Sequence, residues 1–140
     1  MTAHEYLRQY EYALYRAERA RHSYELEMER IDAIGSTLSN EPGMPHGSGI
    51  SRKTEDKAIR LADKASAWLD AEADAQAKLR EIVSFIDSIP GVEGAALYQR
   101  YVMRLGWTQI ADNLDYTESG IFRVRERALV MAEQKLCSEI

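Results

Sequence analysis

Apolar residues recur every three or four positions along the first 90 residues, which is the repeat of helices that share one buried seam. Neither proline nor glycine interrupts residues 5–34, so we predict a long helix over about residues 3–35. The repeat resumes over residues 52–89, and the prolines and glycines of residues 36–51 predict a loop between the two helices. The predicted seam of the first helix comprises Leu7, Tyr10, Leu14, Ala17, Arg21, Tyr24, Met28 and Ile31.

The two seams can be aligned antiparallel, with Tyr24 opposite Trp68, so we predict a long antiparallel helical hairpin over residues 1–90. The same alignment puts Arg21, the charged residue of the first seam, opposite Glu72, the charged residue of the second seam. This apposition predicts an ion pair that fixes the register of the hairpin. The alternative is a pair of unrelated charges that reach water at a loose seam, because arginine side chains extend easily to solvent.

The apolar spacing shortens after Pro90, and residues 91–140 are predicted to form a separate module of three helices. Gly106 is expected to end the first of these helices, whereas Thr108 and Thr117 can each cap the helix that follows. The three predicted helices cover about residues 95–105, 109–114 and 118–136.

The last two predicted helices match the helix-turn-helix motif, in which the second helix enters the major groove of DNA. Asp115 stands at the turn, where a left-handed backbone is needed and aspartate adopts it at modest cost. The predicted inward positions of the motif are Ile110, Ala111, Leu114, Ile121 and Val124. The residues predicted to bind DNA, from the start and outer face of the last helix, are Thr117, Glu118, Ser119, Gly120, Phe122, Arg123 and Arg127.

Several side chains of this outer face suit the groups that DNA offers. Ser119 can bond phosphate or base edges, and Arg123 and Arg127 can pair with phosphate or with guanine. Gly120 permits close approach of the helix to its target. Glu118 can accept a hydrogen bond from a cytosine amino group, although its commoner role is to stabilise a helix N-terminus.

Three segments of this module resemble the ArpU/RinA-type phage transcriptional regulators: LYQRYV over residues 97–102, WTQIADNL over residues 107–114 and YTESGIFRVRERAL over residues 116–129. The C-terminal part of that family is similar to sigma factor region 4. The resemblance covers about residues 92–136. It implies a protein that binds double-stranded DNA through the helix starting at Glu118, activates late phage genes and contacts RNA polymerase. The abundance of alanine, glutamate, arginine and leucine, with only three prolines, independently predicts an all-α fold.

The charge balance bears on how such a protein would bind DNA. The formal net charge of −5 argues against nonspecific coating of nucleic acid, which needs an excess of basic residues. Residues 118–136 hold four basic and three acidic side chains, so phosphate contacts alone would give modest affinity. A homodimer would double the set of contacts. The alternative function is a protein-interaction module that docks RNA polymerase or another phage protein without binding DNA, which the acidic balance and an exposed Phe122 would allow.

Composition also narrows the remaining function classes. The three histidines are scattered and have no carboxylate or cysteine at ligand spacing, so no metal and no cofactor are expected. Carboxylates such as Glu25, Glu27 and Glu29 are placed on solvated helix faces without a cleft, so nothing indicates an enzyme. No apolar run approaches the roughly 20 residues that cross a bilayer, and the single cysteine suits a reducing compartment, so we expect the bacterial cytoplasm.

Overall fold

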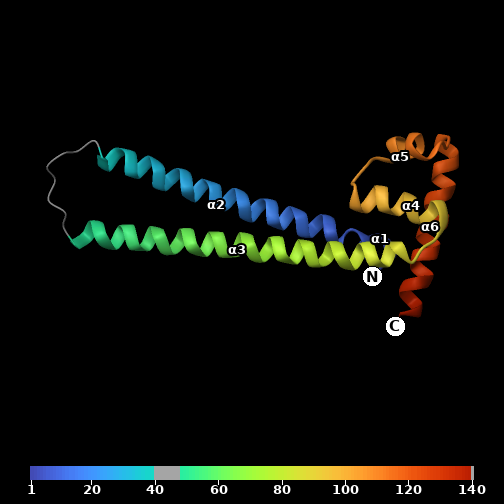
Figure 1. The fold of residues 1–140 in the computed structure, drawn as a ribbon, viewed down its shortest axis with the longest axis horizontal. Coiled ribbons are helices and arrows are strands. Elements are labelled where there is room, and N and C mark those ends of the chain that lie inside the picture. Colours follow the sequence, from blue (N-terminus) through green and yellow to red (C-terminus); the bar gives the residue numbers. More distant parts are fainter. Residues whose placement is uncertain (40–47, 140) are drawn as a thin grey trace. The chain divides into compact units, whose positions relative to one another are not determined.

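The computed structural model describes residues 1–39 and 48–139, with side chains for residues 1–32 and 52–139. Every regular element in these ranges is a helix, which confirms the all-α fold class (Figure 1). The elements are α1 (Ala3–Leu7), α2 (Gln9–Ser39), α3 (Ser48–Asp87), α4 (Gly91–Leu97), the π-helix η1 (Tyr98–Val102), α5 (Trp107–Leu114) and α6 (Glu118–Ser138).

The chain forms two compact units. Unit 1 comprises Met1–Ala13 and Asp74–Ile140, and unit 2 comprises Leu14–Ala73. This division differs from the boundary predicted after residue 90, because the first 13 residues and the last turns of α3 belong with the C-terminal helices. Periodicity identifies the buried side of a helix, but it does not identify the neighbour that covers that side.

The single helix predicted over residues 3–35 is observed as α1 and α2, which are separated at Arg8, and both long helices extend further into the predicted loop than expected. The helix α2 continues through Gly35 to Ser39, and α3 already begins at Ser48. One glycine costs a helix only about 1 kcal/mol relative to alanine, which neighbouring turns can absorb. The predicted loop at residues 36–51 is therefore helical at both ends, and its central residues 40–47 lie outside the described part of the chain.

The helix α6 is the centre of unit 1, where it packs against α4, α5 and α1. The backbone N–H of Ala3 donates to the Glu133 carboxylate at 2.9 Å, which ties the start of α1 to α6. Gly94 allows α4 to approach the connection that follows α3, because a Cβ there would clash with the carbonyl oxygen of Ile89. Four of the five residues predicted to face inward are buried in one core cluster, and the fifth, Leu114, is partly buried against it. The buried members are Ala96, Ile110, Ala111, Ile121 and Val124, and the partly buried residues packed against them are Val92, Leu105, Trp107 and Leu114.

The turn between α5 and α6 has the predicted chemistry. Asp115 adopts the left-handed conformation, with φ 60° and ψ 43°, at the end of α5. The N–H of Tyr116 then donates to the Ala111 carbonyl at 2.8 Å, a bond typical of helices that end in this way. Thr117 caps α6 by accepting the N–H of Gly120 at 3.1 Å. These two caps join the helices through a turn of three residues.

The helix boundaries before this turn differ from the prediction. The helix predicted over residues 95–105 is observed as α4 followed by η1 and ends at Val102. Gly106 is itself the N-cap of α5, so the prediction that Thr108 caps this helix is wrong. The extended backbone of Gly106, with φ −74° and ψ 157°, lets the helix begin at Trp107, so Thr108 lies inside the first turn.

In unit 2, the segments of α2 and α3 run antiparallel side by side (Figure 1). The rings of Tyr24 and Trp68 meet with centroids 5.4 Å apart, which confirms the predicted pairing of these residues. Among the described side chains of unit 2, only Ala17 and Glu27 are buried. Glu27, 8% exposed, therefore does not lie on a solvated face as predicted; its carboxylate lies 3.9 Å from the exposed guanidinium of Arg30.

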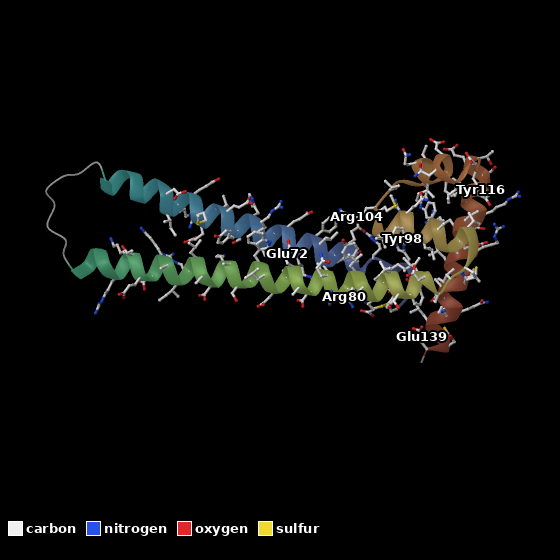
Figure 2. The ribbon with its side chains drawn as sticks, viewed as in Figure 1. Glu72, Arg80, Tyr98, Arg104, Tyr116 and Glu139 are labelled. Atoms are coloured by element: carbon white, nitrogen blue, oxygen red, sulfur yellow. The ribbon has the colours of Figure 1, made fainter. Side chains whose placement is uncertain are left out.

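The predicted ion pair between Arg21 and Glu72 does not form. Arg21 is exposed and lies 3.6 Å from Glu25 on its own helix. Glu72 is also exposed and accepts a hydrogen bond from the Trp68 indole at 3.2 Å (Figure 2). Positions three and four residues apart both border the same seam, so the repeat alone does not decide which of them faces the partner helix.

Candidate nucleic-acid interface

The outer face at the start of α6 is oriented by the residues that anchor the helix. Ile121 and Val124 are buried in the cluster shared with α5. Because a helix has about 3.6 residues per turn, the side chains on the opposite side must face solvent. Six of the residues predicted to bind DNA are exposed, and Gly120 is half-buried; the exposed six are Thr117, Glu118, Ser119, Phe122, Arg123 and Arg127.

Two of these residues have a structural task at the N-terminus of α6. The Thr117 hydroxyl accepts the N–H of Gly120 and lies 3.4 Å from the Ser119 hydroxyl. A Cβ at Gly120 would lie 3.1 Å from the Thr117 hydroxyl and 3.2 Å from the Tyr116 ring, so glycine allows the cap to close. Ser119 caps no backbone group in the described structure, and its exposed hydroxyl can meet a ligand.

The two arginines of the outer face differ in their surroundings. Arg123 is exposed and forms no ion pair or hydrogen bond with any other residue that the structure describes. Arg127 instead donates from Nε to the carboxylate of Glu93 at 3.2 Å, which joins α6 to α4. The carboxylate of Glu93 offsets the charge of Arg127 and engages its Nε, although other guanidinium donors remain available for phosphate or base. Arg123 is therefore the cation best placed to contact nucleic acid.

An apolar component accompanies these polar groups. Phe122 is 47% exposed and Val130 is 55% exposed on α6. Exposed apolar side chains can contact thymine methyl groups or protein partners. The outer face of α6 thus combines the unpaired guanidinium of Arg123, the hydroxyl of Ser119 and the exposed ring of Phe122.

Arg125, at the edge of this face, contributes to folding. Its guanidinium lies 5.6 Å from the ring centre of Trp107, and the guanidinium of Arg100 lies 5.7 Å from the same ring. Trp107 is the first residue of α5, so these cation–π contacts connect η1, α5 and α6. The two contacts stabilise the start of α5 close to the turn that precedes it.

Sequence reasoning missed a second concentration of positive charge in unit 1. A hollow of about 370 Å³, which we call the arginine pocket, is lined by His4, Arg8, Glu11, Arg100, Tyr101, Arg104 and Arg125. One signal was present, because Arg100 and Arg104 lie four residues apart. The other members come from both ends of the chain, so only the folded structure brings them together.

Comparison with protein-family models, curated proteins and solved structures finds no match for this chain. Within the described ranges, no group of three or more histidine, cysteine or acidic residues is arranged to hold a metal ion. No described helix has both the length and the apolar character that crossing a membrane requires. In the described part of the chain every regular element is a helix, and unit 1 presents an exposed polar start of α6 and the arginine pocket.

Proposed function

We propose that this protein is a sequence-specific regulator of transcription that reads the major groove of double-stranded DNA with the start of α6. The observation that carries the proposal is Arg123, an exposed and unpaired cation on the side of α6 opposite the buried Ile121 and Val124. A major groove about 12 Å wide admits one helix, and arginine is the side chain that most often reads guanine there.

The packing of α5 and α6 supports this role. The small residue Ala111 is buried in the cluster that contains Ile110, Ile121 and Val124, and a three-residue turn joins the two helices. In helix-turn-helix proteins such packing holds the reading helix rigidly against the first helix. Rigid presentation lowers the entropy that is lost when the helix enters the groove.

The resemblance of residues 97–129 to ArpU/RinA-type regulators extends the proposal to the control of late genes of a phage or prophage, with contact to RNA polymerase. Homodimerisation belongs to the same proposal, because the local charge balance gives one copy few phosphate contacts. Two copies bound to two half-sites would double these contacts.

The test is fluorescence anisotropy with DNA fragments from the protein's own genomic neighbourhood, at two salt concentrations and with random DNA as competitor. Specific binding must survive the competitor. Arg123→Ala is expected to weaken specific binding by about 1–3 kcal/mol, the value of one good base contact. The matched control is Arg80→Ala, which removes an exposed arginine from α3, and it should leave binding unchanged.

Two results would contradict the proposal at different levels. Equal affinity of Arg123→Ala and the unchanged protein would remove Arg123 from the interface. Absence of specific binding at low salt to every fragment would remove the DNA-binding function itself. Arg127→Ala is expected to have the smaller effect of the two arginine variants, because Glu93 already pairs with Arg127.

A second candidate function is a module that docks RNA polymerase or another phage protein without binding DNA. The observation that favours it is the exposure of Phe122 and Val130 on α6. Exposed aromatic residues are common anchors of protein interfaces. A pull-down of the host polymerase that is lost in Phe122→Ala, together with no specific DNA binding, would select this function.

A further inference from the structure

The arginine pocket gathers four guanidinium groups from separate parts of unit 1. Arg8 lies between α1 and α2, Arg100 lies in η1, Arg104 lies in the connection after η1 and Arg125 lies in α6. Arg104, labelled in Figure 2, is one of two described non-glycine residues with a positive φ, at 61°. This left-handed backbone costs about 1 kcal/mol or more for a residue with a side chain.

The pocket is strongly positive. Four arginines and one carboxylate, Glu11, give a sum of 4 − 1 = +3 when His4 is neutral, in a chain whose net charge is −5. Burial and the charges of Arg8, Arg125 and Arg100 hold the pKa of His4 below its ordinary value, which keeps the imidazole neutral at pH 7. Like charges repel one another, so an anion in the pocket would relieve this repulsion.

Neighbouring groups hold the walls of the pocket in place. Tyr101 is buried, and its hydroxyl is hydrogen-bonded to Nδ1 of His4 across 2.7 Å. Arg100 donates from Nη1 to the carbonyl of Leu105 at 3.1 Å. Since a guanidinium has five N–H donors, this bond orients Arg100 and leaves donors for a ligand. Such orientation lowers the cost of binding, because the side chain is already ordered.

We infer that the arginine pocket binds an anion that carries a phosphate group. Guanidinium groups match phosphate oxygens through paired hydrogen bonds, and a phosphate carries up to two negative charges against the excess of three positive charges. A volume of about 370 Å³ lies in the range of small-ligand sites. The phosphate has two possible sources, a free phosphorylated small molecule and the backbone of DNA.

This inference goes beyond the proposed function, and only the DNA-backbone source of phosphate depends on DNA binding. None of the residues that line the pocket belongs to the predicted DNA-reading set on the outer face of α6. A ligand in the pocket would connect Arg8 and His4, near the N-terminus, to Arg125 of α6. It would therefore stabilise unit 1 whether or not α6 reads DNA.

The first experiment is isothermal titration calorimetry of the full chain with inorganic pyrophosphate at constant ionic strength. The key variant is Arg104→Gly, which removes one guanidinium and also suits the left-handed backbone, so the fold should be kept. We expect saturable binding that weakens at least fivefold in Arg104→Gly and is unchanged in the matched control Arg80→Ala. Circular dichroism spectra and the unfolding temperature of both variants verify the fold.

The second experiment separates the two sources of phosphate. The DNA affinity of Arg104→Gly is measured at several salt concentrations. If the DNA backbone occupies the pocket, the variant loses affinity for all sequences and its salt slope falls by about 1. If a free ligand occupies it, pyrophosphate binding weakens in the variant while DNA binding stays the same.

The inference is overturned if pyrophosphate does not bind and the DNA salt slope of Arg104→Gly equals that of the unchanged protein. It is also overturned if Arg104→Gly and Arg80→Ala weaken pyrophosphate binding equally, because that result indicates diffuse attraction by surface charge. Failure of the α6 proposal is distinguishable from both, since it is read from Arg123→Ala and from sequence-specific binding.

Discussion

Unit 1 and unit 2 show how one sequence pattern leads to two kinds of packing. In unit 1, large apolar side chains such as Leu7, Ile82, Leu97 and Ile110 are fully buried. In unit 2, the described buried side chains are Ala17 and Glu27, whereas Leu69 is 67% exposed. Both units contain helices with apolar residues every three or four positions.

The difference comes from the number of helices that meet in each unit. Two antiparallel helices cover only one stripe of each other, so side chains at its margins stay partly in water. In unit 1, α6 packs against α1, α4 and α5 together, and its buried stripe continues from Ile121 to Ala132. The comparison teaches that the repeat provides apolar stripes, while a further helix is needed to turn them into a core.

The strongest test of this difference in packing is to remove apolar side-chain volume from each unit. Ile110→Ala in unit 1 is expected to lower the free energy of unfolding by about 2–5 kcal/mol, because it deletes buried methyl groups and leaves a cavity. Ile59→Ala in unit 2 is expected to change it by less than about 0.5 kcal/mol, since Ile59 is mostly exposed. Guanidinium chloride unfolding followed by circular dichroism measures both. Equal losses would mean that unit 2 is covered as well as unit 1.

The second test concerns the buried glutamate of unit 2, Glu27. Glu27→Leu is expected to raise the stability of unit 2 by about 1–3 kcal/mol, because a leucine side chain at this buried position removes more apolar surface from water. The substitution also removes the ion pair with Arg30, but this costs little stability because the Arg30 guanidinium is exposed and 3.9 Å away. Amide hydrogen exchange in α2 and α3 reports the change.

The matched control for Glu27→Leu is Glu25→Leu, which replaces an exposed glutamate on the same helix. It should change amide exchange little, since a half-exposed leucine buries little apolar surface between the two helices. A loss of protection in Glu27→Leu would show that the carboxylate holds the two helices together, contrary to the expectation.

The smallest expected effect is a pH dependence in unit 1. The Tyr6 hydroxyl donates to Glu81 at 3.1 Å, and burial together with this carboxylate raises the pKa of Tyr6 from 10.0 to about 12. The folded protein therefore keeps a proton that the unfolded chain loses, so this contribution is present below pH 10 and is lost as pH rises to about 12.

Tyr6→Phe is expected to show a shallower loss of stability over the same pH window, measured by urea unfolding. The control Tyr116→Phe removes a hydroxyl that makes no hydrogen bond with a described residue. It should show the same slope as the unchanged protein. A slope for Tyr6→Phe equal to that of the control would contradict the assigned role of Tyr6.

Local features of the fold could be predicted where they depend on neighbours in the chain. The left-handed turn at Asp115 and the cap at Thr117 involve groups within a few residues of each other, so short-range rules suffice for both. The inward position of Ile121 and Val124 follows from helical periodicity alone. The same reasoning placed Arg21 in the seam and Glu27 in solvent, because it cannot distinguish two positions that border one seam.

The sequence by itself determined the all-helical class, the apolar stripes, the turn between α5 and α6 and the outer face of α6, because these depend on contacts within a few residues. Only the tertiary structure decided that the first 13 residues join the C-terminal helices in unit 1. The tertiary structure alone also assembled the arginine pocket from Arg8, Arg100, Arg104 and Arg125. Contacts between distant segments depend on which stripes cover one another in three dimensions, and neither periodicity nor composition contains that information.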